Sequence, residues 1–118
     1  MENFQFTVLL VEDDLENADL TKTILMLHGF KIEHQPTAQN ALDFLNKNSV
    51  HAIVSDINLG KMNGVEFYKK IRDQGLNIPF VLMTGYSLNR SWFGADQKYK
   101  AAHFFFKPFS VDDLAKHL

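Results

Sequence analysis

The stretch FTVLLVEDD, residues 6–14, decides the fold, because an apolar run stops abruptly at three acidic residues. A run of β-branched and aliphatic residues of this length is typical of a central strand buried on both faces. An amphipathic segment follows at 15–27, where Asp14 is the expected N-cap and Gly29 gives a helix-ending signal. The chain therefore opens with a strand, an acidic loop and a helix.

The same alternation of an apolar run and a helix-period segment recurs along the chain. Further strands are predicted at 30–34, 51–55, 79–84 and 103–106. Further helices are predicted after Thr37, after Asn63, at about 91–100 and after Ser110. Strands that alternate with helices imply a parallel sheet with helices on both faces. We therefore expect one α/β domain over residues 1–118, with no output domain.

Composition narrows the class of protein. The 118-residue chain has a net charge of −2 and no cysteine, which leaves no basic field for nucleic acid and no disulfide or thiolate site. The N-terminus has no signal-peptide pattern, and no apolar stretch is long enough to span a bilayer. We expect a cytoplasmic protein that binds neither nucleic acid nor membrane directly.

Polar side chains stand at the ends of four predicted strands. Glu12 and Asp13 follow the first strand, Asp56 follows the third, Thr84 ends the fourth and Lys107 follows the fifth. In open parallel sheets the ligand site lies at the carboxyl ends of the strands. We therefore expect these side chains to converge on one small area.

The chemistry of this set favours phosphoryl transfer. Carboxylates this close repel one another unless a cation lies between them. Mg²⁺ suits a site with a few carboxylates, bound waters and a substrate phosphate. Lys107 and Thr84 can contact phosphoryl oxygens, and Gly85 leaves room for the group to approach. Asp56 is then a candidate nucleophile that forms an aspartyl-phosphate.

Four segments together resemble the response-regulator receiver domain of two-component signalling. They are VEDD at 11–14, DINLGKMNG at 56–64, TG at 84–85 and KPF at 107–109. Their order and approximate spacing match the family across nearly the whole chain. The resemblance implies a CheY-like, flavodoxin-like fold: a doubly wound, five-stranded parallel sheet in the order 2-1-3-4-5.

The resemblance also implies a role for each site residue. Asp56 would be the phosphoacceptor, and Thr84 and Lys107 would bind the phosphoryl oxygens. The metal, Mg²⁺ or alternatively Mn²⁺, would be held by four residues: Glu12 through water, Asp13, Asp56 and the backbone carbonyl of Asn58.

Two further features are implied for the switch between states. Thr84 and Phe104 would be the switch residues, and the Lys107–Pro108 bond would be cis, which aims the lysine at the acids. Phe104 lacks the hydroxyl of the commoner tyrosine, so its outward state would lose a hydrogen bond. Gly60 replaces the family's usual proline, so the loop after the acceptor is expected to be more mobile.

The resemblance implies partners as well. A sensor histidine kinase or a histidine phosphotransfer protein would donate the phosphoryl group. A downstream protein would bind the face made by the fourth helix, fifth strand and fifth helix. The domain would be a monomer or a phosphorylation-dependent dimer. It would assist only its own phosphorylation and dephosphorylation, and is otherwise not expected to be an enzyme.

Three alternatives stay open at this point. A scaffold of the same fold would bind partners without being phosphorylated. A phosphohydrolase with an aspartyl nucleophile generally carries a second Asp two residues later, where this chain has Asn58. A nucleotide- or flavin-binding domain would need a Gly-rich or hydroxyl-rich first loop, whereas residues 12–14 are acidic.

Overall fold

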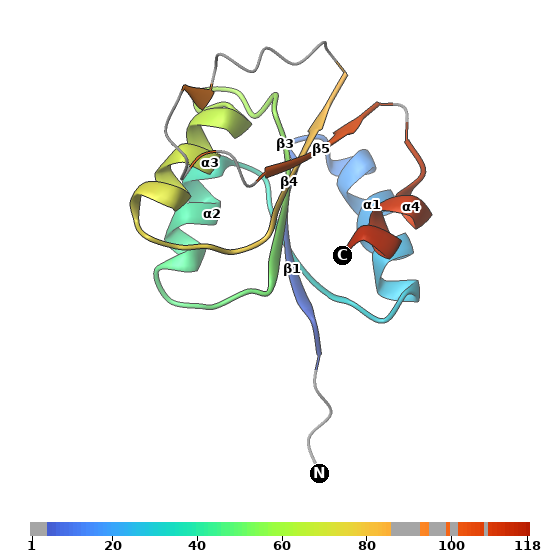
Figure 1. Ribbon diagram of the computed structural model, residues 1–118. Coiled ribbons are helices and arrows are strands. Elements are labelled where there is room, and N and C mark those ends of the chain that lie inside the picture. Colours follow the sequence, from blue (N-terminus) through green and yellow to red (C-terminus); the bar gives the residue numbers. More distant parts are fainter. Residues whose placement is uncertain (1–4, 86–92, 95–98, 100–101, 108) are drawn as a thin grey trace.

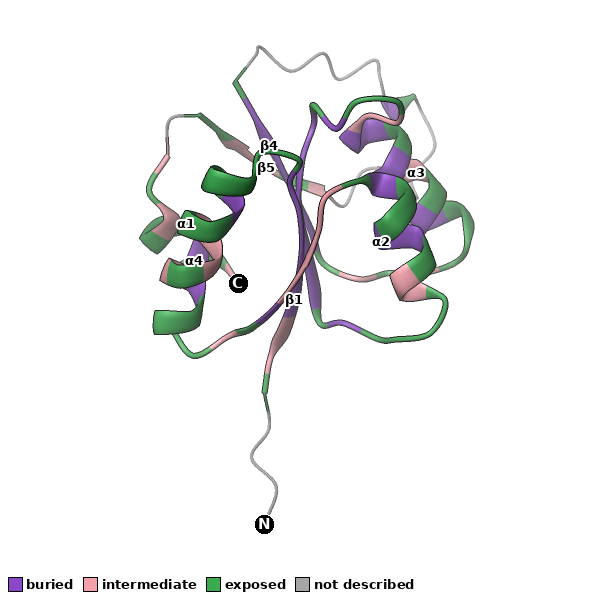
Figure 2. Ribbon diagram, turned by 180° about the vertical axis from the view of Figure 1, so that it is seen from behind, coloured by how far each residue is buried: buried purple, intermediate pink, exposed green. Residues whose placement is uncertain are grey.

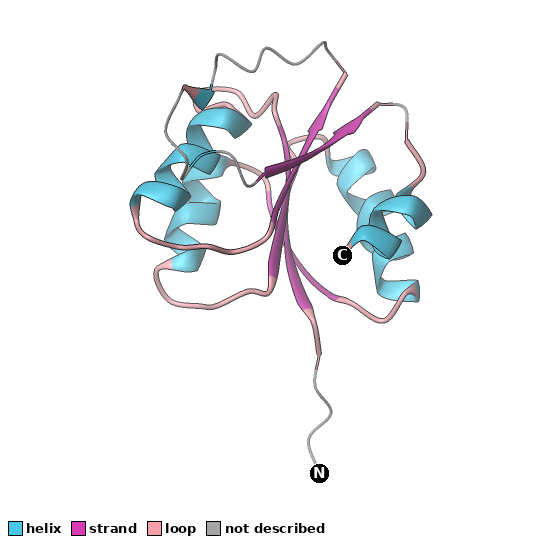
Figure 3. Cartoon of the chain, in the orientation of Figure 1, coloured by secondary structure: helices cyan, strands magenta, loops and turns pink. Residues whose placement is uncertain are grey.

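Five parallel strands form a single sheet in the order β2-β1-β3-β4-β5 (Figures 1 and 3). The computed structural model describes residues 5–85, 93–94, 99, 102–107 and 109–118. The strands are β1 (Thr7–Val11), β2 (Lys31–Gln35), β3 (Ala52–Asp56), β4 (Phe80–Thr84) and β5 (Ala102–Phe106). The helices are α1 (Leu15–Leu27), α2 (Ala38–Leu45), α3 (Gly64–Asp73) and α4 (Val111–His117).

The predicted α/β class and strand order are confirmed. The bounds of α1 match the sequence prediction, and each strand matches to within one residue at each end. The helix expected at about 91–100 lies mostly outside the described residues, as does Pro108 with the cis bond predicted before it. The element labelled α4 is therefore the last of the expected helices.

Helices cover both faces of the sheet. Helices α1 and α4 pack on one face, and α2 and α3 on the other (Figure 1). Alternate side chains of β1 enter the two cores: Leu9 packs on the α2/α3 side and Leu10 on the α1/α4 side. Strands β3 and β4 are buried along their whole length, as expected for central parallel strands (Figure 2).

Side-chain caps place the helix starts. Asp14 Oδ1 accepts hydrogen bonds from the N–H groups of Glu16 (3.0 Å) and Asn17 (3.1 Å), which confirms it as the N-cap of α1. Asn63 caps α3 in the same way, through a 2.8 Å bond from Glu66 N–H. At the far end of α1, Gly29 has a φ of 94°, the left-handed conformation that ends helices. The caps fix the loops that carry the acidic residues.

The longest described helix, α1, has 13 residues. None of the helices in the described ranges is both long and apolar enough to cross a bilayer.

Candidate functional site

The polar residues predicted at the strand ends lie together at the carboxyl edge of the sheet. Glu12 follows β1, Asp56 is the last residue of β3, Thr84 ends β4, and Lys107 follows β5. Three of these side chains belong to residues that are almost fully buried: Glu12 is 4% exposed, Asp56 5% and Thr84 2%. Buried polar groups of this kind need partners close by.

Asp56 is held through both of its carboxylate oxygens. Lys107 Nζ donates to Oδ2 at 2.7 Å, and the backbone N–H of Asn58 donates to Oδ1 at 3.1 Å. The Asp56 side chain is 8% exposed and that of Lys107 38%, so the lysine reaches the acid from the solvent side. The acid is therefore fixed in direction by one ammonium and one backbone N–H.

Glu12 lies beside Asp56, and we call the site formed by Glu12, Asp56 and Lys107 the acid pocket. Burial raises the pKa of Glu12 to about 7, and the charge of Asp56 acts in the same direction. A hydrogen bond from Asp14 N–H to Glu12 Oε1 (3.1 Å) and the charge of Lys107 oppose the rise. The pocket therefore holds more carboxylate than one lysine neutralises.

The same acids raise the pKa of Lys107. Burial alone would lower the pKa of Lys107, but the hydrogen bond to Asp56 and the charges of Asp56, Glu12 and Asp13 outweigh it. The pKa of the ammonium is raised above its ordinary value, and the group stays charged throughout the neutral range.

Asp13 and Asn58 lie at the mouth of the pocket, where both are exposed. Asp13 also lines a cleft of about 650 Å³ between the start of α2 and the loop after β3. A second hollow, of about 280 Å³, lies beside Glu12 and Lys107 and is floored by Met83 and Phe109. Asp13 and Glu12 therefore each border one of these hollows, whereas Asp56 borders neither.

These residues fit a Mg²⁺ ion that keeps several waters. Among the described residues, no group of three or more His, Asp or Glu side chains is arranged to hold a metal ion by itself. Mg²⁺ needs less than that, because it is usually bound by one or two carboxylates, waters and a phosphate. Burial, and next to it the charge of Asp56, raise the pKa of Glu12, and a divalent cation beside these acids would favour their charged forms.

The comparison with known families gives a direct result. The model of the response regulator receiver domain matches residues 8–118, nearly the whole chain. The chain belongs to the response-regulator receiver family. The resemblance read from the four motifs is thereby confirmed, and this is a receiver domain of two-component signalling.

Two curated relatives show how receivers of this kind occur in longer proteins. The transcriptional regulatory protein CpxR homolog of Haemophilus influenzae is 39% identical over 79 residues, which cover 65% of this chain and 33% of the relative. Response regulator SaeR of Staphylococcus aureus is 28% identical over 112 residues, which cover 91% of this chain and 46% of SaeR. The receiver thus spans less than half the length of these relatives.

Solved structures are similar over nearly all of the receiver. The receiver domain of the Francisella response regulator 1452 has a TM-score of 0.83 at 25% identity, covering 94% of this chain and 91% of that one. A signal receiver domain of a histidine kinase from Syntrophus aciditrophicus has a TM-score of 0.81 at 29% identity, covering 94% and 85%. Receiver domains generally use Mg²⁺, and response regulators act with histidine kinases and downstream effectors.

The two predicted switch residues lie on adjacent strands of the receiver. The Thr84 carbonyl accepts a 2.7 Å hydrogen bond from Lys107 N–H, which ties the ends of β4 and β5 together. Phe104 is half-buried, and its ring lies edge-on to that of Phe93 at 5.5 Å. Phe93 in turn contacts the buried ring of Tyr68 at 5.9 Å, so Phe104 lies at the outer end of an aromatic chain.

Sequence reasoning missed two contacts of the receiver site. Gly64 starts α3 directly against the Asp56 carbonyl, and a Cβ there would overlap it. His34, on β2, contacts the Glu12 carbonyl through Nε2 at 2.8 Å. The sequence shows the glycine of the NG pair at 63–64, but it does not show that the Asp56 carbonyl lies against this glycine. The His34 contact depends on the register of β2 with β1, which no local pattern gives.

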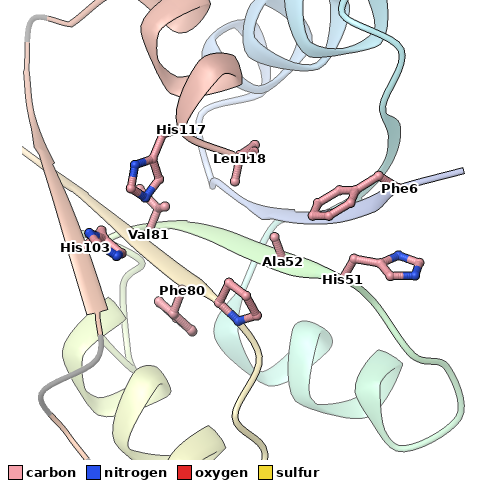
Figure 4. Close-up of a pocket in the computed structure, with 9 residues that line it drawn as sticks. Phe6, His51, Ala52, Phe80, Val81, His103, His117 and Leu118 are labelled. Carbon is pink, nitrogen blue, oxygen red and sulfur yellow. The ribbon is translucent and has the colours of Figure 1, made fainter.

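Another hollow lies at the opposite, amino-terminal edge of the receiver's sheet. This pocket of about 330 Å³ is lined by Phe6, His51, His103 and His117, among others (Figure 4). The rings of His103 and His117 are 4.3 Å apart, and burial and the neighbouring His103 lower the pKa of His117. The strands separate this pocket from Asp56, so it is not part of the acid pocket.

Proposed function

We propose that this receiver domain accepts a phosphoryl group on Asp56 and uses it to switch a protein-binding surface. The observation that carries the proposal is the Asp56 carboxylate itself. It is almost fully buried, lies at the carboxyl edge of the sheet, and is bound by Lys107 at 2.7 Å beside a second buried acid. A carboxylate held in this way is a positioned nucleophile.

The transfer step follows from these contacts. A carboxylate oxygen of Asp56 attacks the phosphorus of a phosphohistidine, the P–N bond breaks as the P–O bond forms, and the imidazole leaves with its bonding electron pair. Lys107, released from Asp56 Oδ2, binds a phosphoryl oxygen as a charged ammonium. The Thr84 hydroxyl donates a hydrogen bond to another phosphoryl oxygen. Mg²⁺, when bound, neutralises charge on the transferring group.

The metal site we propose consists of Asp13, Asp56, the backbone carbonyl of Asn58, and Glu12 through a water molecule. Glu12 and Asp56 supply buried charge, and exposed Asp13 leaves the solvent side open for waters. A hard cation with few protein ligands is what such a set prefers, with Mn²⁺ as an alternative to Mg²⁺.

The switch would act through Thr84 and Phe104. Pulling Thr84 towards the phosphoryl group vacates space near Phe104, whose ring now packs on Phe93. To move a two-state equilibrium from 1:99 to 99:1 takes about 5.5 kcal/mol of differential interaction. A new charge-assisted bond from Thr84 and a bound metal, with Lys107 exchanging Asp56 for a phosphoryl oxygen, would supply this difference.

The proposed partners follow from this reaction. A sensor histidine kinase or a histidine phosphotransfer protein donates the phosphoryl group. A downstream protein binds the face that includes β5 and α4, and the domain is a monomer or a phosphorylation-dependent dimer. Its catalysis is limited to its own phosphorylation and dephosphorylation.

The side chain of Asn58 weighs against the phosphohydrolase alternative. Asn58 stands where such enzymes carry their acid/base, and it approaches Asp56 Oδ1 with its backbone N–H. An amide side chain does not exchange protons at neutral pH, so rapid turnover has no acid to assist it. A scaffold that acts without phosphorylation remains the rival to be tested.

The test is incubation with acetyl phosphate and Mg²⁺, followed by intact-mass measurement. We expect one phosphoryl adduct in the wild type and in Asp19→Asn, an exposed control on α1, and none in Asp56→Asn. Absence of the adduct at every Mg²⁺ concentration would favour the scaffold. Steady release of phosphate from small substrates would favour the hydrolase.

A further inference from the structure

His34 lies one residue before the end of β2, beside the loop that carries the acids. We propose that His34 is a positioning residue for the metal site, because its ring holds the peptide unit from which Asp13 projects. The inference rests on the proposed function. It gives a role in the site to a residue that is neither an acid of the site nor Thr84 or Lys107.

The contact itself is well defined. His34 Nε2 lies 2.8 Å from the Glu12 carbonyl oxygen, and His34 is partly buried. A carbonyl oxygen only accepts hydrogen bonds, so Nε2 carries the proton and donates it. The bond forms with either the neutral or the protonated ring, so it holds the loop at any pH near neutral.

Among the described residues, the Glu12 backbone is held through its N–H and its carbonyl, and its carboxylate contacts Asp14 N–H and the Asp56 side chain. Its N–H donates to the Gln35 carbonyl at 3.2 Å, and its Oε1 accepts from Asp14 N–H at 3.1 Å. Both partners are backbone groups, which nearly any residue would supply. The third bond, to the Glu12 carbonyl, comes from the imidazole of His34.

The third bond controls the direction of Asp13. The Glu12 carbonyl and the Asp13 N–H belong to one planar peptide unit, so fixing the C=O direction fixes the plane. That plane fixes the positions of the Asp13 nitrogen and Cα and so helps to set the direction in which the side chain leaves the backbone. Within the described part of the chain, the Asp13 side chain itself has no hydrogen bond or ion pair, so its direction depends on how the backbone is held.

Loss of the imidazole should therefore weaken Mg²⁺ binding without removing a ligand. Groups that orient metal ligands typically contribute 10–100-fold to metal affinity, and we expect about 10-fold for this exposed site. The other two bonds keep the loop in place, so the fold should survive.

The experiment compares two substitutions at His34. In His34→Leu the donor is lost, and calorimetric titration should show Mg²⁺ affinity reduced about 10-fold. In His34→Gln the amide can reach the same carbonyl, and affinity should stay within about 3-fold of wild type. In the metal-free protein, the NMR signal of the Asp13 amide should shift or broaden in the Leu variant and return in the Gln variant. Should the Leu variant not fold, His34→Asn, whose amide is too short, replaces it.

A matched control is present at the other end of β1. His51 Nδ1 accepts a 3.0 Å hydrogen bond from Thr7 N–H, so it is also an imidazole that tethers this strand through its backbone. His51→Leu should lower the denaturation midpoint and leave Mg²⁺ affinity unchanged. The control separates loss of stability from loss of metal positioning.

The outcomes separate the two claims. Wild-type affinity in a folded His34→Leu protein, or equal loss in the Leu and Gln variants, would overturn the role of His34 while leaving the proposed function in place. A wild-type protein that neither binds Mg²⁺ nor forms the phosphoryl adduct would overturn the proposed function, and the role of His34 with it.

Discussion

Lys107 Nζ lies 2.7 Å from Asp56 Oδ2, although the two residues are 51 positions apart in the sequence. The pair joins the last residue of β3 to the residue after β5, across the end of β4. The ammonium is therefore already bound to the carboxylate that we propose as the phosphoacceptor. In the proposed reaction, Lys107 would exchange Asp56 Oδ2 for a phosphoryl oxygen.

Lys107→Met should destabilise the metal-free protein through Asp56. The Asp56 side chain is 8% exposed and would lose its charged partner, whereas Lys107 is 38% exposed, so solvent reduces the loss to about 1–2 kcal/mol. Urea denaturation in EDTA measures it. In the Asp56→Asn background the same substitution should cost less than about 0.5 kcal/mol. Equal losses in both backgrounds would show that the pair does not couple.

Glu12 should make the stability of the metal-free protein fall as pH rises. The folded protein holds the Glu12 proton up to a pKa of about 7, against an ordinary value of 4.5. Between these values the unfolded chain binds fewer protons than the folded one, so the free energy of unfolding decreases with rising pH. The loss due to Glu12 is at most about 3 kcal/mol.

Denaturation at pH 5 and pH 7.5 in EDTA tests this effect of Glu12. Glu12→Gln should flatten the fall, because a neutral amide has no proton to release. Glu66→Gln, an exposed control on α3, should keep the wild-type slope. Mg²⁺ should restore stability at pH 7.5 in the wild type more than in Glu12→Gln. Parallel pH curves for wild type and Glu12→Gln would contradict the assignment.

The fold was predictable because its signals are local. Continuous apolar runs, segments with helical periodicity and the caps Asp14 and Asn63 mark the elements without reference to distant residues. Several strand ends differ by one residue from the prediction, because pairing with the neighbouring strand determines where a strand ends. Asp56, for example, was expected after its strand but pairs with Met83 as the last residue of β3.

The site was predictable only in part. Strand-end positions indicate that Glu12, Asp56, Thr84 and Lys107 gather at one edge, since parallel strands end together. The pattern does not say which groups touch. The bond of His34 to the Glu12 carbonyl requires the β1–β2 register, which arises from the packing of both strands between the helices. Contacts of this kind are tertiary, and no short window of sequence contains them.

Arg72 illustrates the same limit in the core and gives another prediction. This residue is only 6% exposed, and its guanidinium donates to the carbonyls of Leu76 and Ile78, each at 2.8 Å, while lying 4.8 Å from the ring centre of Tyr68. These two hydrogen bonds tie the loop between α3 and β4 to the end of α3.

Arg72→Lys should cost about 2 kcal/mol, because one ammonium nitrogen replaces the two guanidinium nitrogens that each bind one carbonyl, and one carbonyl is expected to lose its partner. Thermal or urea unfolding measures the loss. Lys70→Ala, an exposed control on the same helix, should change stability by less than about 0.5 kcal/mol. A loss as small in Arg72→Lys as in the control would show that solvent replaces the second bond.

Substitution by alanine should destabilise the protein at Gly64 but not at Gly85. A Cβ at Gly64 would overlap the Asp56 carbonyl and lie 2.9 Å from Ile57 Cα, and backbone atoms cannot easily yield. A Cβ at Gly85 meets no heavy atom within 4 Å. Gly64→Ala should therefore cost about 1–3 kcal/mol of stability by overpacking, whereas Gly85→Ala should leave stability within about 0.5 kcal/mol.

Both variants should form the phosphoryl adduct with acetyl phosphate more slowly than the wild type, but for different reasons. Gly64→Ala pushes on the end of β3 and should slow adduct formation together with the loss of stability, because it moves the Asp56 backbone. Gly85→Ala should slow adduct formation at full stability, because the added methyl group stands beside Thr84, where the phosphoryl group is expected to approach. Urea midpoints and adduct rates measured on both proteins give the comparison. Wild-type adduct rates in Gly85→Ala would place the approach of the phosphoryl group on another side of Asp56.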